Sequence, residues 1–196
     1  AAVSGTLLLS GGARFDWVAT RNTGGHFGDR SEDNTALSGF VAATLGPGHG
    51  FSATAQAAWG FRDPTLSDRY FRGPSGRGFI TGNPDLEPET SLQFDLSARY
   101  TLARTQIGVF YYDYRIDDLI ERYSTQTDFF FFRNRGEGHI SGFEIETRTD
   151  LGHGYTIELG GHIGRGELND DGSSLDDISP DTFLALLRKD FGQRAF

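Results

Sequence analysis

The sequence predicts an all-β protein, a transmembrane antiparallel up-and-down β-barrel with about eight strands. Three observations support this prediction. Apolar residues alternate with polar or small ones over stretches of about ten residues, short connections alternate with long ones, and aromatic residues lie near the expected strand ends. A helical fold is excluded because glycine recurs inside almost every stretch and no apolar stripe with helical spacing persists.

The first three expected strands show the alternation in chain order. In LLLSGGARFDW (7–17) the odd positions are apolar or small, whereas the even positions include Arg14 and Asp16. Residues 36–45 alternate more weakly. In FSATAQAAWGFR (51–62) the odd positions hold only alanine, phenylalanine and tryptophan, and the even positions are mostly small or polar. Successive side chains of a strand point to opposite faces, so each stretch has one apolar face.

Five more strands are expected in the rest of the chain. SLQFDLSARY (91–100) and YTIELGGHIG (155–164) alternate clearly, and weaker candidates cover residues 105–118, 138–150 and 181–189. Each stretch is near the 9–11 residues that a tilted strand needs to cross a bilayer. The apolar half of each strand therefore suits contact with lipid, and the polar half suits a wetted interior.

Short and long connections alternate along this series of strands. The short ones are residues 46–50, 102–104 and 151–154, and the long ones are residues 19–34, 63–89, 119–137 and 168–180. This arrangement is typical of outer-membrane barrels, which have tight periplasmic turns and long extracellular loops. The aromatic residues that suit headgroup girdles are Trp17, Trp59, Phe61, Tyr100 and Tyr155. The alternative is a β-sandwich or a lipocalin-like barrel, in which these aromatics are ordinary core residues.

The composition limits the classes of function. The 196 residues suffice for one domain, and the absence of cysteine excludes disulfides and thiolate metal sites. Methionine is absent even at position 1 and no signal-peptide pattern occurs, so we expect a mature or excised segment. The net charge of −9 argues against nucleic acid as a partner.

No catalytic or metal-binding constellation is evident. Without cysteine, and without a histidine placed beside a serine and a carboxylate, we expect no catalytic residues and no enzyme activity; an outer-membrane hydrolase is the alternative. His26 and His139, in expected extracellular loops, could ligate haem iron, but isolated loop histidines are usually only polar. ELNDDGSSLDD (167–177) half matches a calcium loop, but Ile178 stands where the bidentate glutamate belongs, which favours a solvated acidic loop. We predict no metal site and no cofactor.

One long stretch, from WGFRDPTLSDRY through GNPDLEPE to the following strand, closely resembles part of the TonB-dependent outer-membrane receptors. The matching residues are Gly60, Phe61, Arg62, Pro64, Leu66, Asp68, Tyr70 and residues 82–89. Four further segments resemble the family in the same order: FYYDYRIDDLIERY (110–123), FRNRGEGHISGFEIETR (132–148), YTIELGGHIGRGELND (155–170) and ISPDTFLALLRKDFG (178–192). The resemblance covers nearly the whole chain.

The resemblance implies a 22-stranded barrel with an N-terminal plug and a TonB box. Residues 1–196 are then expected to be a segment of the barrel domain, without the plug, the box, the early strands and about the last four strands. The implied location is the outer membrane of a Gram-negative bacterium, and the implied function is TonB-coupled uptake of a ferric siderophore or a similar large nutrient. The implied partners are outer-membrane lipid, TonB and an iron chelate. Receptors for cobalamin, haem and carbohydrate share these motifs and are alternatives.

Two sets of residues are candidate sites. The polar strand positions are expected to face the lumen and the plug, because arginine facing lipid costs about 2–4 kcal/mol at the bilayer midplane; they are Arg14, Asp16, Arg62, Asp95, Arg99, Glu144, Glu146, Arg148 and Glu158. The alternative is a network of salt bridges with no transport role. Aromatic and arginine residues of the long connections are expected to bind an anionic, aromatic iron chelate; they are Tyr70, Arg72, Arg77, Phe79, Phe130, Phe132 and Arg133.

GNPDLEPE (82–89) is expected to close the longest extracellular connection, before a strand that begins at Thr90. Pro84 and Pro88 withhold amide donors where strand pairing must not begin early. A second overall hypothesis is a small autonomous eight-stranded barrel with a structural or adhesion role. It requires the first strand, around residues 5–18, to hydrogen-bond to the last, around residues 181–189.

Overall fold

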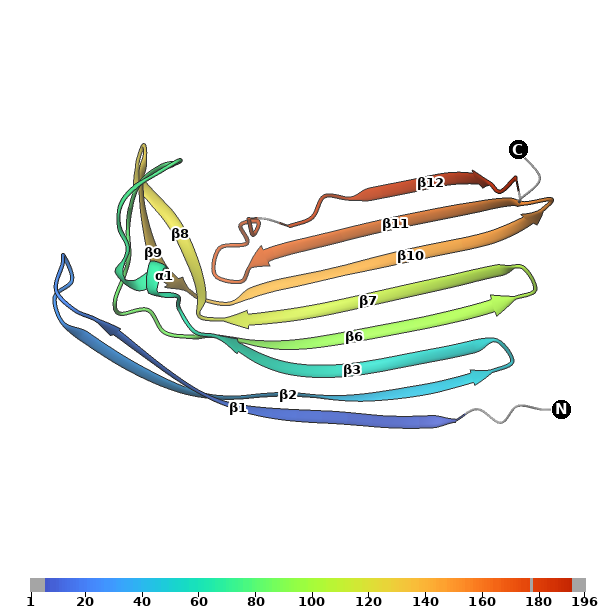
Figure 1. The fold of residues 1–196 in the computed structure, drawn as a ribbon, viewed down its shortest axis with the longest axis horizontal. Coiled ribbons are helices and arrows are strands. Elements are labelled where there is room, and N and C mark those ends of the chain that lie inside the picture. Colours follow the sequence, from blue (N-terminus) through green and yellow to red (C-terminus); the bar gives the residue numbers. More distant parts are fainter. Residues whose placement is uncertain (1–5, 177, 192–196) are drawn as a thin grey trace.

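The computed structural model describes residues 6–176 and 178–191. Its eight long strands are β1 (Leu7–Asn22), β2 (Arg30–Gly48), β3 (Phe51–Arg62), β6 (Glu89–Leu102), β7 (Thr105–Asp117), β10 (Gly138–Gly152), β11 (Tyr155–Leu168) and β12 (Thr182–Lys189). They form one sheet in the order β1-β2-β3-β6-β7-β10-β11-β12 (Figure 1). Every neighbouring pair is antiparallel, so the predicted up-and-down arrangement of eight strands is confirmed.

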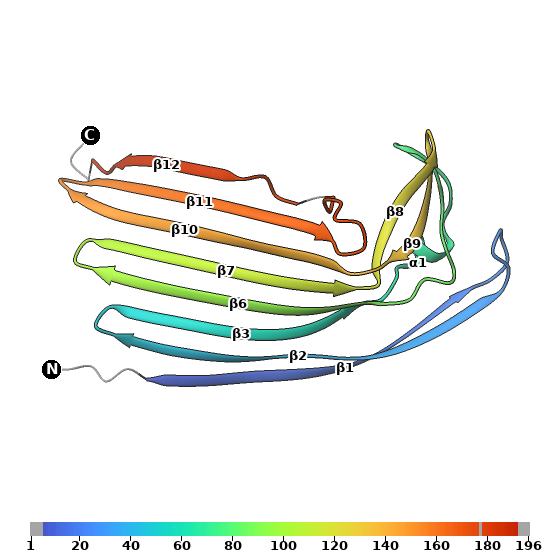
Figure 2. The same ribbon diagram turned by 180° about the vertical axis from the view of Figure 1, so that it is seen from behind.

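A second, smaller sheet stands at one end of the long strands (Figures 1 and 2). Its order is β4 (Arg72–Ser75), β5 (Gly78–Thr81), β9 (Phe129–Arg135) and β8 (Leu119–Gln126). Because β5 and β9 pair in parallel, two connections that are far apart in the sequence share one sheet. The expected long connections over residues 63–89 and 119–137 therefore carry regular structure of their own.

The short helix α1 (Leu66–Tyr70) precedes the small sheet. Thr65 caps it by accepting a hydrogen bond from the amide of Asp68, and the Asp68 carboxylate accepts one from the amide of Thr65. This reciprocal capping satisfies amides that a helix start leaves unpaired. No helix among the described residues is long and apolar enough to span a membrane.

Three tight turns join the long strands at the end opposite the small sheet (Figure 1). Each has two residues between its strands, at positions 49–50, 103–104 and 153–154. His49 and His153 have φ angles of 51° and 53°, each followed by a glycine that also has positive φ, as hairpin turns of type I′ require. Short and long connections thus alternate between the two ends as predicted.

The first long connection is shorter than predicted. Residues 19–22 and 30–34 belong to β1 and β2, so only residues 23–29 are left to form the loop. Trp17 consequently lies inside β1 and not at its end, which corrects the prediction for this residue. The strands were predicted from the alternation of apolar and polar residues. In this part of the hairpin both faces are polar, so the backbone pairing continues but the alternation is absent.

The ladder register assigns the side chains to two faces. Residues directly opposite each other in antiparallel strands point to the same side. One row across the sheet consists of Leu7, Leu45, Ala53, Ala98, Val109, Ile145, Gly161 and Phe183. The next row, on the opposite side, consists of Leu8, Thr44, Thr54, Ser97, Phe110, Glu144, His162 and Thr182. We call these sides the apolar face and the polar face.

The band of apolar residues crosses the strands obliquely. On β12 its last member towards the small sheet is Phe183, whose row reaches Leu7 on β1. On β1 the band extends ten residues further, to Trp17. The ten residues, at about 3.3 Å each, shift the band along the strands by nearly the same length as the seven strand spacings of about 4.8 Å that separate β1 from β12. Equal lengths along and across the strands mean that the strands are tilted by about 45° from the normal to the band. Transmembrane barrels have strand tilts of about 35–45°.

The sheet has two free edges in the described part of the chain. There β1 pairs only with β2, and β12 pairs only with β11. The autonomous eight-stranded barrel is therefore wrong, because it requires these two edges to pair. The β-sandwich and lipocalin-like alternatives are also wrong, because no second layer covers the apolar face, where Phe15 and Trp17 are more than 60% exposed.

Candidate functional site

The polar face carries all nine residues that were predicted to face the lumen. The register places Arg14 and Asp16 on the same side of the sheet as the other seven, which are Arg62, Asp95, Arg99, Glu144, Glu146, Arg148 and Glu158. They do not form one site, because they extend along the whole length of the strands. Arg14 pairs with Asp16 at the β1 edge, far along the sheet from Arg148 and Glu158.

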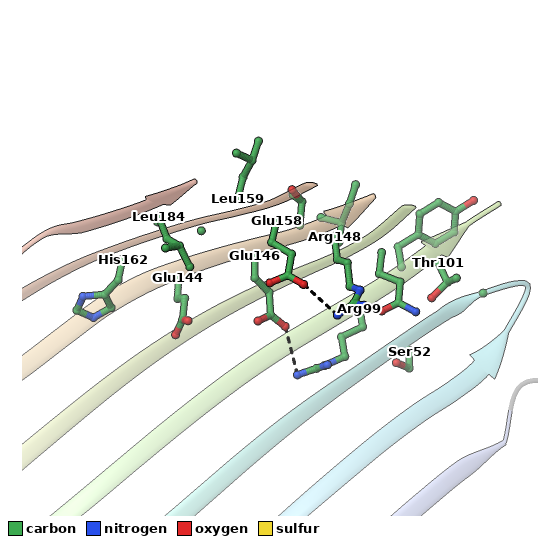
Figure 3. A pocket seen from close by; sticks show the side chains of 18 of the residues that line it. Ser52, Arg99, Thr101, Glu144, Glu146, Arg148, Glu158, Leu159, His162 and Leu184 are labelled. Atoms are coloured by element: carbon green, nitrogen blue, oxygen red, sulfur yellow. Dashed lines mark hydrogen bonds and ion pairs between the residues drawn. The ribbon is translucent and has the colours of Figure 1, made fainter. Parts of the chain in front are cut away.

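A hollow of about 720 Å³ lies on the polar face towards the tight turns; we call it the lower hollow (Figure 3). Two ion pairs cross it, from Arg99 to Glu146 at 3.5 Å and from Arg148 to Glu158 at 3.0 Å. Glu144 also lines it, and no partner for its carboxylate is present among the described residues. The hollow thus combines neutralised ion pairs with one free carboxylate.

A row of hydrogen-bonded aromatic residues lies on the polar face beyond the lower hollow. The hydroxyl of Tyr112 lies 3.0 Å from Nε2 of His162, and the hydroxyl of Tyr114 donates to Asp95 at 2.9 Å. The Tyr112 ring lies flat across the sheet over Gly142, where an added Cβ would collide with the phenol. Glycine at this position therefore lets Tyr112 reach across β10 to His162 on β11.

The GNPDLEPE segment ties the two large extracellular connections together. Asn83 donates to the Phe132 carbonyl at 3.1 Å. Asn134 accepts from the Glu87 amide at 2.8 Å and donates to the Glu87 carbonyl at 2.9 Å. Glu89 begins β6, one residue before the predicted Thr90, and accepts from the Ile120 amide at 2.6 Å and from Arg62 at 2.6 and 2.8 Å. We call residues 63–89 with residues 119–137 the extracellular body, after the side on which outer-membrane barrels carry their long connections.

Arg69 is the anchor of this body. Its side chain is buried, donates to the Leu86 carbonyl at 2.9 Å and to the Thr20 hydroxyl at 3.3 Å, and lies 3.9 Å from the Asp63 carboxylate. Pro64 and Leu86 are buried with it. The sequence analysis matched Asp68 and Tyr70 on either side but missed Arg69, because an arginine in a short helix gives no periodic signal of burial.

Arg135 joins the last long connection to the extracellular body. It donates to Glu121 at 2.9 Å and to Asp170 at 3.5 Å, and it also pairs with Asp171. Its bond to Glu121 is the main cause that raises the pKa of Arg135. Hydrogen bonds from Ser173, with Arg135 nearby, lower the pKa of Asp171.

The same contacts bear on the half-matched calcium loop. Arg135 already supplies a cation to Asp170 and Asp171. No group of three or more potential metal-ligating side chains occurs among residues 6–176 and 178–191. His139 is not in a loop as predicted but in β10, on the apolar side, where its Nε2 lies 2.7 Å from Asp113. His26 lies in the loop between β1 and β2 and is exposed.

A second hollow, of about 690 Å³, lies between the extracellular body and the ends of the long strands; we call it the upper hollow. Its charged lining consists of Arg62, Asp68, Glu89, Glu121, Arg122, Arg135 and Asp176. Its apolar lining consists of Ile116, Leu119, Ile120, Phe132, Ile140, Leu168 and Leu175. Arg62, Glu89, Glu121 and Arg135 pair with one another or with neighbours. Among the described residues Arg122 has no ion-pair partner, and it stacks on the Phe130 ring at 5.3 Å.

The residues predicted to bind a ligand do not converge on one surface. Consecutive residues of β9 point to opposite faces of the small sheet, so Phe130 and Phe132 lie on one side and Arg133 lies on the other. Arg133 stacks on Tyr123, and Arg72 stacks on Phe79, on the same side as Arg133. The other two positions are Tyr70, at the end of α1, and Arg77, in the turn between β4 and β5.

Of the predicted ligand residues, Phe132 alone lines the upper hollow. The sequence analysis missed Tyr123, Phe129 and Phe131, which lie beside the stacked arginines, and Arg122, which lines the upper hollow. The period of two within FFFF was the signal that could have separated these residues into two faces.

Comparisons with known proteins identify the barrel. The family model "TonB dependent receptor-like, beta-barrel" matches residues 2–192. The chain is 31% identical over 128 residues to the vitamin B12 transporter BtuB of Vibrio vulnificus (strain YJ016), an alignment that covers 63% of this chain and 20% of that protein. The relatives found are named as transporters and receptors.

Solved structures show the same fold. The copper transporter OprC superposes with a TM-score of 0.80 at 19% identity, over 94% of this chain and 31% of that one. The FrpB iron transporter of Neisseria meningitidis (F3-3 variant) superposes with a TM-score of 0.68 at 17% identity, over 96% of this chain and 29% of that one. The siderophore receptor PirA of Pseudomonas aeruginosa gives a TM-score of 0.59 at 15% identity, over 80% of this chain and 34% of that one.

The chain thus spans about a fifth of the curated relative and about a third of each of these structures. The oblique apolar band, the tight turns at one end and the large connections at the other agree with the family model and with these folds. The chain belongs to the TonB-dependent receptor family and forms part of its transmembrane β-barrel.

Proposed function

We propose that this chain is part of a receptor in a Gram-negative outer membrane that takes up a ferric siderophore, or a similar large nutrient, with energy supplied through TonB. The observation that carries the proposal is the contrast between the two faces of the sheet. One face presents an uncharged band at the tilt of a membrane barrel, and the other presents charged and hydrogen-bonding side chains along its full length. A wall of this kind separates lipid from a wetted interior.

The polar face supports a role as the lumenal wall against which a plug docks. Within the ion pairs Arg99–Glu146 and Arg148–Glu158 the charges largely cancel. These pairs therefore link neighbouring strands and need no oppositely charged residue on the plug. Glu144 and His162 offer an acceptor and a hydrogen-bonding ring in the same hollow. A plug segment with arginine or lysine side chains suits this free carboxylate.

The upper hollow supports capture of the nutrient on the extracellular side. Its volume of about 690 Å³ falls within the range of small-molecule sites, and its lining combines apolar side chains with the unpaired cation Arg122. The Arg122 guanidinium suits an anionic group of a chelate, and the apolar side chains suit its apolar or aromatic body. In this proposal the extracellular body captures the ligand, a plug occludes the lumen, and TonB pulls on the plug to release it.

Cobalamin is the second candidate ligand. The observation that favours it is the 31% identity to the vitamin B12 transporter BtuB. The matching barrel motifs are shared among receptors for different ligands, so they mark the family. The residues of the upper hollow would then contact a bulky, mostly uncharged corrinoid, for which Arg122 would contribute less than the apolar lining.

Growth of a strain that lacks the whole receptor tests the proposal. Under iron limitation the strain is fed defined ferric chelates, and in a parallel culture it is made dependent on added cobalamin. We expect loss of growth on at least one ferric chelate, and restoration by the receptor gene. Restoration by an Arg122→Gln receptor should be weaker than by Arg77→Gln, a matched change at an exposed arginine outside the hollow. Loss of growth on cobalamin alone would overturn the siderophore assignment.

A further inference from the structure

The apolar face is not smooth but contains a groove of about 400 Å³. Small side chains on neighbouring strands form its floor, namely Ala43, Ala53, Ala55 and Ala98. Tyr111 and Phe143, opposite each other on β7 and β10, form its rim towards the extracellular end. The groove is therefore a trough in the lipid-facing surface, one side-chain length deep, where bulky residues surround alanines.

A charged cluster of Asp113, Arg115 and His139 lies next to the rim on the same face, towards the extracellular end. The next apolar-side position on β7 after Tyr111 is Asp113, and the Tyr111 hydroxyl donates to its carboxylate at 3.4 Å. Asp113 also lies 2.7 Å from Nε2 of His139 and 3.7 Å from Nε of Arg115. Along β7 the apolar-side residues thus change from the amphipathic Tyr111 to the charged Asp113 and Arg115 where the oblique band ends.

Arg115 is the available cation of this cluster. Its side chain is 69% exposed, and in the described part of the chain its one ion-pair contact is the 3.7 Å approach to Asp113. Arg165, nearby on β11, is by contrast held in a two-pronged pair with Asp181 at 2.7 and 3.0 Å. The Asp113 carboxylate is shared with His139 and Tyr111, so it neutralises Arg115 only in part. Most of the guanidinium donors of Arg115 are free.

We propose that the groove and Arg115 together form a binding site for one acyl lipid with a phosphate headgroup. An acyl chain would fill the alanine-floored groove, and the phosphate would accept hydrogen bonds from Arg115 at the level where the apolar band ends. Guanidinium and phosphate match in charge and in geometry, since two parallel N–H groups can bond two phosphate oxygens. Filling the trough with an acyl chain also restores the contacts that a void on the lipid face would lack.

The occupant follows from the chemistry of the two ends. Water does not suit the groove, because its floor has no hydrogen-bonding side chain and bulk hydrocarbon lies outside it. An acyl chain of a bulk lipid that exchanges freely would need no cation at the rim. A phospholipid combines both requirements, because its acyl chain suits the groove and its phosphate, next to the chain, suits Arg115. This inference is independent of the ligand that the receptor transports.

The test compares two lipids and two pairs of variants of the complete receptor, purified in detergent and stripped of lipid. Binding of phosphatidylglycerol and of diacylglycerol with the same acyl chains is counted by native mass spectrometry. Ala55→Leu fills the floor, and Ala57→Leu is the matched control, two residues along the same strand and face but outside the groove. Arg115→Gln removes the cation, and Arg30→Gln, at an exposed arginine where β2 begins, is its control.

We expect the unchanged receptor to retain one phosphatidylglycerol at least fivefold more strongly than diacylglycerol. Ala55→Leu should lower the retention of both lipids severalfold, and Ala57→Leu should not. Arg115→Gln should abolish the preference for phosphatidylglycerol and leave diacylglycerol unchanged. Equal retention by Ala55→Leu and Ala57→Leu would overturn the groove, and an unchanged preference in Arg115→Gln would overturn the headgroup site. Nutrient uptake should be normal in all four variants, so failure here is distinct from failure of the proposed function.

Discussion

The membrane part of the sheet and the extracellular body are stabilised in opposite ways. The long strands expose most of their large apolar side chains on one face and have no core beneath them. The extracellular body has a small interior in which Pro64, Leu86 and Arg69 are buried together, and Arg69 donates hydrogen bonds to the Leu86 carbonyl and to Thr20 of β1. The strands thus depend on ladder pairing and on the surrounding lipid, whereas the body depends on a few polar side chains at fixed positions. Substitutions should therefore have different costs in the two regions.

Arg69→Met should have the largest effect. It leaves the partly buried Asp63 without its cation and the Leu86 carbonyl without its donor, and breaking a fully buried pair, the upper bound here, costs about 3–5 kcal/mol. We expect the extracellular body to open while the long strands stay paired. Hydrogen exchange should rise at residues 63–89 and 119–137 and remain slow in β6 and β7. Arg72→Met, at an exposed arginine close by, is the control; equal exchange in both variants would contradict the anchoring role.

A charge on the apolar face should have the next largest effect. Ala55→Arg directs a guanidinium into lipid, which costs about 2–4 kcal/mol near the midplane. Thr54→Arg, one residue earlier, directs the same group to the polar face and should cost little. The folded fraction in refolding into lipid vesicles, followed by the gel shift of the heat-stable barrel, compares the two. Similar folded fractions would mean that the faces are assigned the wrong way round.

Gly142→Ala should have a moderate effect on the polar face. The new Cβ meets the Tyr112 ring, and overpacking of this kind costs about 1–3 kcal/mol. Gly60→Ala, where the nearest atom is the Ser91 hydroxyl at 3.4 Å, should be nearly neutral. Denaturant midpoints measure both. Adding Tyr112→Ala to Gly142→Ala should recover part of the loss, and no recovery would exclude the ring as the cause.

Acidification should have the smallest effect, confined to residues 168–180. The pKa of Asp171 is lowered in the folded protein, so its contribution is present above the ordinary pKa near 4 and is lost as pH falls through the lower folded value. Below about pH 4 we expect lower protection factors at the amides of Gly172 and Ser173, that is, faster hydrogen exchange relative to the intrinsic rate at the same pH. Asp171→Asn should show low protection factors already at neutral pH, and pH-independent protection in the unchanged protein would contradict this role of Asp171.

The same contrast explains which features the sequence could predict. Alternation reports a difference in solvent between two faces, so it located the eight membrane strands and placed Arg99, Glu146 and Glu158 correctly on one face. Outside the bilayer both faces meet water, and the signal disappears although pairing continues, as in residues 30–34 of β2 and in β8. Aromatic content within FFFF predicted a binding surface, and the period of two requires its residues to divide between two faces, but the pattern does not tell which residues border the upper hollow. Arg69 and Asn134 act through a few specific hydrogen bonds that no periodicity reveals.

The order of the strands has a consequence for how the barrel is made. Each long strand pairs with the long strand that follows it in the chain, and three of the links are turns of two residues. Hairpin pairing of this kind needs little loop closure, so contacts of short sequence separation dominate. The sheet can therefore grow by adding one hairpin at a time to an open edge. The parallel contact between β5 and β9, which spans about 50 residues, has to wait until β6 and β7 have paired.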